Sequence, residues 1–169
     1  MTPEQSMRIY LAECSLHAEI LEEGLVDART WTTPLSSSIL IEKEMLRILD
    51  QIAYRFAKLQ DSMGEKVMPL ILELAQETVP ANATFTEKLN RLERIGAIPS
   101  AEEWKKFRVV RNALAHDYPD DPELRTSTIN RFLQGAANLS ALYRFVREYA
   151  GVHFPEVGRG NDMIGVQVK

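Results

Sequence analysis

The chain contains few of the residues that hold metals or form crosslinks. Its 169 residues include one cysteine, Cys14, and three histidines, His17, His116 and His153. A single cysteine excludes a disulfide framework within the chain. A structural zinc site usually takes four ligands in two closely spaced pairs, and the Cys14 and His17 pair has no second pair to match it. We therefore expect neither a metal site nor a cofactor.

Long hydrophobic runs are also missing. Apolar residues make up 45% of the sequence and charged residues 26%, but no apolar segment approaches the roughly 20 residues of a membrane span. The N-terminal segment carries acids and lacks the basic and apolar layout of a signal peptide. These features predict one globular domain in the cytoplasm, with no membrane partner.

An excess of positive charge is missing as well. The formal net charge is −4, which argues against broad, unspecific binding of nucleic acid. One basic segment stands out, because Lys105, Lys106, Arg108 and Arg111 lie within seven residues with no acid among them. Such a run is more often a solvated helix face, but it also suits a local site for an anion.

Most of the sequence shows helical periodicity. Apolar residues recur at three- and four-residue spacing in most of the chain, and no stretch before the tail alternates like a strand. This pattern predicts an all-α fold, an antiparallel bundle of four to five helices with an extra N-terminal helix. We expect an N-terminal helix and linker over residues 1–35, the bundle over 36–150, and a C-terminal tail over 151–169.

Glycines and turn residues give the expected helix boundaries in the first half. The first helix should stop at Gly24. A strongly amphipathic helix should cover residues 39–61, and Ser62 and Gly64 should separate it from a shorter helix.

Capping boxes give the boundaries in the second half. Residues 84–87 and 100–103 both match the S/T-x-x-E pattern, and each should open a helix. The second of these helices should end near Asp117, because the residue before a proline avoids the α region. A last long helix should cover residues 124–149 and end at Gly151.

Residues 111–119, RNALAHDYP, interrupt the apolar pattern with polar side chains. On a helix, Arg108, Asn112 and His116 share one face because they are four residues apart, and Arg111 lies beside them. Histidine moves protons near neutral pH, and the arginine fork binds phosphate oxygens through two donors. This set suits cleavage of RNA without a metal, in which the 2′-OH attacks the adjacent phosphorus.

One histidine and one arginine make a sparse site, which a two-fold dimer would double. The pattern alone leaves another interpretation open. A histidine at the negative end of a helix dipole, with polar residues in the preceding turn, is an ordinary solvated helix end.

The same residues resemble a known family. Residues 111–118, Arg-Asn-Ala-Leu-Ala-His-Asp-Tyr, are similar to the R-x4-H-x-Y motif of the HepT-like branch of the HEPN superfamily. The segment TFTEKLNRLERIGAIPSAEEWKKFRVVRNALAHDYPDD also resembles the family's approach to that motif. The resemblance covers about residues 36–150. It implies a HEPN-like helical bundle and a homodimer with the motif at its interface. It further implies a metal-independent RNA endonuclease, the toxin of a toxin–antitoxin pair, acting on tRNA or mRNA and leaving 2′,3′-cyclic phosphate ends.

The resemblance also implies roles for single residues. Arg111 and His116 match the catalytic pair, and Asn112 supports their geometry, with Arg108 added from its place on the helix face. Tyr118 matches the tyrosine that an MNT-type nucleotidyltransferase antitoxin modifies with AMP. The alternative within this family is a non-enzymatic HEPN bundle that serves as the binding partner of a nucleotidyltransferase.

Overall fold

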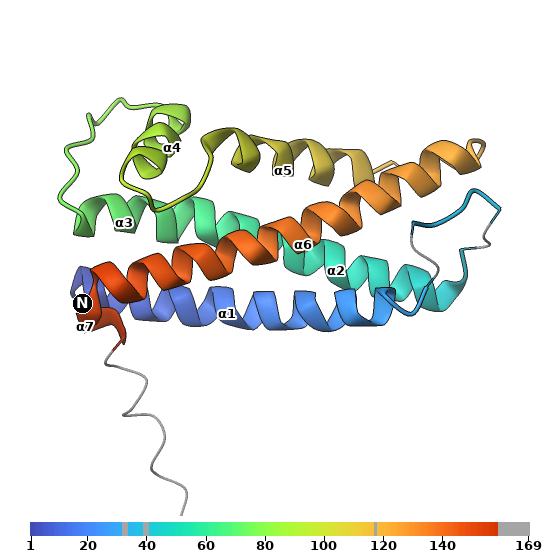
Figure 1. The fold of residues 1–169 in the computed structure, drawn as a ribbon, viewed down its shortest axis with the longest axis horizontal. Coiled ribbons are helices and arrows are strands. Elements are labelled where there is room, and N and C mark those ends of the chain that lie inside the picture. The colour runs from blue at the N-terminus through green and yellow to red at the C-terminus, as the bar shows by residue number, and fades with distance from the viewer. Residues whose placement is uncertain (32–33, 39–40, 117, 159–169) are drawn as a thin grey trace, which may run out of the picture. The chain divides into compact units, whose positions relative to one another are not determined.

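The computed structural model describes residues 1–31, 34–38, 41–116 and 118–158. This part of the chain is helical and contains no strand, which confirms the predicted all-α class (Figure 1). None of its helices has the length and apolarity that a membrane crossing requires. The elements are α1 (Pro3–Ala28), α2 (Lys43–Ser62), the π-helical turn η1 (Met63–Val67), α3 (Met68–Leu74), α4 (Phe85–Arg94), α5 (Ala101–Leu114), α6 (Pro122–His153) and α7 (Pro155–Gly158).

The contacts divide the chain into two compact units, and the long helices α1, α2 and α6 contribute to both. Unit 1 comprises residues 1–15, 61–101 and the chain from residue 142 onward; unit 2 comprises residues 16–60 and 102–141. All residues of the predicted site fall within unit 2. The sequence-based division at residues 35 and 150 remains a prediction.

Aromatic side chains form the core of unit 2. The Phe56 ring of α2 meets Phe107 of α5 and Phe132 of α6 edge-on, with centroid distances of 6.1 and 5.4 Å. The Trp104 ring lies 5.9 Å from that of Phe107. Buried aromatic side chains dominate core energetics, and edge contacts add to their burial. These contacts hold α5 against α2 and α6, so the core fixes where the end of α5 lies.

The predicted stop of the first helix at Gly24 is wrong, because α1 continues to Ala28. Gly24 lies opposite Ile52 of α2, where an added Cβ would stand 2.6 Å from the Ile52 Cγ1 atom. Gly135 of α6 allows a similar approach to Val110 of α5, at 2.9 Å. A side chain at either glycine would hold the helices apart, so these glycines mark close packing inside helices.

The predicted break at Ser62 and Gly64 is also wrong. The helix passes through this segment as a π-helical turn and continues into α3. The backbone N–H of Met68 donates to the carbonyl of Met63, a π-type hydrogen bond. Pro69, in the first turn of α3, has no N–H to donate. A π-turn inserts one residue into a helix without ending it.

The capping box at Thr84 is confirmed. Thr84 Oγ1 accepts from the Glu87 N–H at 3.2 Å, and Glu87 Oε2 accepts from the Thr84 N–H at 2.6 Å. The helix that follows the second box begins at Ala101, as predicted. Both hydrogen bonds at Thr84 satisfy N–H groups that the first turn of a helix leaves without partners.

The last long helix extends beyond its predicted limits at both ends. It begins at Pro122 and runs through Gly151 to His153. Proline suits this first position because its missing N–H would have had no helical partner. The Asp121 Oδ1 atom accepts from the Leu124 N–H at 3.0 Å and caps the helix.

Unit 1 contains the single thiol of the chain. Cys14 is fully buried, and this burial, assisted by the nearby charge of Glu13, raises the pKa of the Cys14 thiol to about 12. Glu13 accepts from the Lys66 ammonium at 2.8 Å and from the Ser62 hydroxyl at 3.0 Å. A thiol with so high a pKa stays protonated and is a poor nucleophile.

Candidate functional site

The segment after α5 turns earlier than the sequence predicts. The helix ends at Leu114 rather than near Asp117, and Asp117 lies outside the described residues. The His116 N–H donates to the Ala113 carbonyl at 3.3 Å, a three-residue hydrogen bond that tightens the last turn. His116 therefore lies in the turn after the helix, and not on the helical face that carries Asn112.

Arg111 lies in the last turn of α5 and is exposed, as are Arg108 and Asn112. Its Nη1 atom makes a long contact of 3.5 Å with Oε1 of Gln60 in α2. Gln60 is buried, with 9% of its surface exposed. At this distance the contact is weak, because N–H···O hydrogen bonds are usually about 2.7–3.2 Å long.

Acids in the first turn of α5 neutralise part of its basic segment. The Lys105 and Lys106 ammonium groups pair with Glu102 and Glu103 at 3.1 and 2.6 Å. The hydrogen bond that the Lys106 ammonium donates to Glu103 raises the pKa of Lys106. All four side chains are exposed, so these pairs contribute little to stability. These two pairs offset two of the four positive charges of the basic segment.

The His116 and Tyr118 rings lie close together beyond the end of α5. Their centroids are 5.8 Å apart and the ring planes are tilted by 50°. His116 is exposed and Tyr118 is half-buried. Tyr118 has a φ of +46°, a left-handed conformation that costs a residue with a side chain about 1–2 kcal/mol. The Asp121 N–H donates to the Tyr118 carbonyl at 3.2 Å and helps to hold this turn.

A groove in unit 2, with a volume of about 380 Å³, opens beside His116. Leu46, Leu49 and Leu114 give it apolar walls, and Arg125 of α6 joins His116 among its polar lining. Leu46 of α2 borders this groove and is 49% exposed. The lining of the groove thus combines His116 of the motif with residues of α2 and α6 that belong to no sequence motif.

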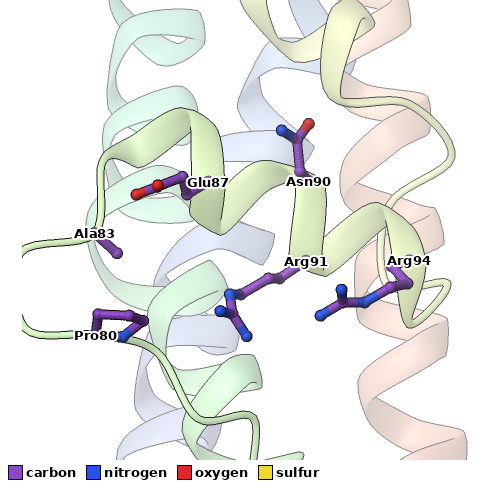
Figure 2. Close-up of a pocket in the computed structure, with 6 residues that line it drawn as sticks. All are labelled: Pro80, Ala83, Glu87, Asn90, Arg91 and Arg94. Atoms are coloured by element: carbon purple, nitrogen blue, oxygen red, sulfur yellow. The ribbon is translucent and has the colours of Figure 1, made fainter.

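A second, smaller cavity lies in unit 1, where α4 faces the segment around Pro80 (Figure 2). Arg91 and Arg94 extend from one side of α4, whereas Asn90 points to the other side. Both guanidinium groups pair with the Glu77 carboxylate, at 3.7 and 3.6 Å. This carboxylate offsets part of the positive charge, and the cavity contains none of the motif residues.

Within the described ranges, no three His, Cys, Asp or Glu side chains gather as metal ligands would. Comparisons with protein-family models, curated proteins and solved structures find no match for the chain. The fold and site define an all-helical protein with an arginine, a histidine and a tyrosine around the end of α5. The membership in the HEPN superfamily that the motif predicts stays a prediction.

Proposed function

We propose that the chain is the toxin of a toxin–antitoxin pair and that it cleaves RNA without a metal ion. The observation that carries this proposal is the arrangement of Arg111, His116 and Tyr118 at the end of α5, in the order of the R-x4-H-x-Y motif. Arg111 and His116 are exposed, as residues that meet a large substrate must be. The HepT-like resemblance supplies the fold, the RNA substrate and the partner in this proposal.

His116 acts as the general base in the proposed reaction. Its imidazole accepts the proton of an RNA 2′-OH, and the 2′-oxygen attacks the adjacent phosphorus. The bond between phosphorus and the 5′-oxygen breaks, and that oxygen takes up a proton. The products are a 2′,3′-cyclic phosphate and a 5′-OH. In a homodimer the second His116, in its protonated form, supplies the proton to the leaving oxygen.

Arg111 stabilises the negative charge that develops on the phosphoryl oxygens, through donors that match two oxygens at once. Gln60 lies 3.5 Å from the Nη1 atom of this guanidinium. Arg108 and Asn112, exposed on the same helix, bind the neighbouring parts of the RNA backbone.

Modification of Tyr118 explains how an antitoxin controls this site. In the reaction of an MNT-type nucleotidyltransferase, the tyrosine oxygen attacks the α-phosphorus of ATP, pyrophosphate leaves and the phenolic proton is lost. AMP on Tyr118 would place bulk and negative charge beside the His116 ring, 5.8 Å away between centroids. It would repel and exclude an RNA phosphate, by the same electrostatics as phosphorylation.

The test is cleavage of tRNA and of mRNA by the full chain in excess EDTA. We expect His116→Ala to lower the rate at least about 100-fold, the lower range for losing a general acid–base group. Arg111→Ala should also lower it at least about 100-fold, as loss of a donor that stabilises developing charge does. His153→Ala is the matched control, because His153 is exposed at the end of α6 in unit 1. Cleavage by His116→Ala at the parental rate would show that the catalytic assignment is wrong.

The pairing of Lys105 and Lys106 with glutamates favours a second candidate, because it leaves less positive charge for RNA. In this alternative the chain is a non-enzymatic HEPN bundle that binds a nucleotidyltransferase. This alternative predicts that the chain co-purifies with the nucleotidyltransferase. It also predicts that the chain without AMP on Tyr118, as a monomer or a dimer, cleaves no RNA.

A further inference from the structure

An arginine of α6, Arg125, lines the groove beside His116, and its Nε atom has no hydrogen-bond partner. The Arg125 Nε atom is shielded from solvent and bonds to nothing. Within the described part of the chain, the Arg125 guanidinium also forms no ion pair. Buried polar groups nearly always have partners, and each exception requires an explanation. An arginine on the wall of a groove that forms no ion pair keeps its positive charge for an anionic ligand.

The surroundings of Arg125 match the parts of a nucleotide. Leu46, Leu49 and Leu114 offer apolar surface for a base, and the volume of about 380 Å³ lies within the range of small-molecule sites. The Asp50 carboxylate also borders the groove. Because an ionised carboxylate only accepts hydrogen bonds, it suits the N–H donors of a base and not a phosphate.

We propose that this groove binds one nucleotide of an RNA strand and that Arg125 binds its phosphate. The inference rests on the proposed function, because His116 borders the same groove and would act on the adjacent linkage. A guanidinium binds two phosphate oxygens side by side through two of its N–H donors. At Arg125 these donors are the Nη groups, because Nε is shielded from solvent. Arg125 is thus a substrate-binding residue from α6 that supplements Arg111 from α5.

The first experiment measures binding separately from cleavage. A fluorescent 2′-O-methyl RNA of mixed sequence has no 2′-OH to attack, so it reports binding by the full chain whether or not the chain is a nuclease. We expect Arg125→Met to weaken binding about tenfold or more, as loss of a charged hydrogen bond does. The slope of log Kobs against log salt should become less negative by about 0.7, the value for one phosphate contact to a single strand.

Arg131→Met is the matched control, because Arg131 lies exposed on the same helix and does not line the groove. We expect it to change binding less than threefold. Arg125→Lys keeps the positive charge but loses the side-by-side pair of donors. It should bind at least threefold more weakly than the parent, and it carries the test if Arg125→Met does not fold.

The outcomes separate this inference from the nuclease itself. If RNA binding depends on Arg125 but the protein cuts no RNA, the nucleotide-binding role of the groove is supported and the proposed nuclease activity is contradicted. If RNA is cut, Arg125→Met should raise KM more than it lowers kcat. Equal binding by Arg125→Met and Arg131→Met, or no RNA binding by the parent chain, overturns the inference.

Discussion

Replacing Gly24 by alanine tests the packing of α1 on α2. Helix propensity alone favours alanine over glycine by about 1 kcal/mol inside a helix. At Gly24, however, the new methyl group would lie 2.6 Å from Ile52 Cγ1 and 3.3 Å from Cδ1, whereas carbon atoms prefer about 3.5–4.0 Å. Overpacking of this kind costs about 1–3 kcal/mol. We therefore expect Gly24→Ala to destabilise unit 2 by about 1 kcal/mol.

Gly151→Ala provides the comparison, because Gly151 also lies inside a helix but has no atom within 4 Å of an added Cβ. It should stabilise the protein by about 0.5–1 kcal/mol. Urea unfolding followed by circular dichroism should therefore separate the two variants by about 2 kcal/mol. In an Ile52→Ala background the cost of Gly24→Ala should shrink, because the clashing atoms are gone. If Gly24→Ala and Gly151→Ala stabilised the protein equally, the close approach of Gly24 to Ile52 would be refuted.

Three further changes test local features of the chain. Thr84→Ala should cost about 1 kcal/mol by removing the helix cap, whereas Thr86→Ala, exposed in the same turn, should not; urea unfolding measures both. Cys14 should react with Ellman's reagent at pH 8 only after urea unfolds the chain, because the pKa of its thiol is about 12 when folded. Folding raises the pKa of the Cys14 thiol from about 9 to about 12, so the folded protein loses stability as the pH rises from 9 towards 12. Cys14→Ala should make this loss of stability smaller. An unchanged loss would contradict the raised pKa of Cys14. Tyr118→Gly should be more stable than Tyr118→Ala by about 1 kcal/mol, because glycine, unlike alanine, adopts a φ of +46° without strain. Thermal unfolding that ranks alanine above glycine would exclude the strained turn.

The sequence predicts the fold best where a local pattern has one physical meaning. The Thr84 capping box satisfies backbone N–H groups only at the start of a helix, and the helix begins there. A glycine has two meanings, because it can end a helix or admit a neighbouring helix. Gly24 does the second. The choice depends on Ile52, and no pattern within α1 reports which residue of another helix packs there.

The same distinction applies to the site. Arg111, His116 and Tyr118 lie within one segment, so a motif can identify them together. Gln60 contacts Arg111 from 51 residues away in the sequence, and Arg125 reaches the groove from another helix. Each lies within an ordinary helical pattern, which carries no sign of its partner. Only packing of α2, α5 and α6 brings these side chains to the motif.

The segment around His116 retains two features that reduce stability. Tyr118 holds a left-handed conformation, and the Arg125 Nε atom is buried without an acceptor. Glycine or asparagine would suit the first position better, and methionine or leucine the second. A solvated helix end selected only for stability has no reason to keep either residue. Strain and unpaired polar groups that gather beside one exposed histidine are typical of binding and catalytic sites. This clustering favours a functional site over an ordinary helix end.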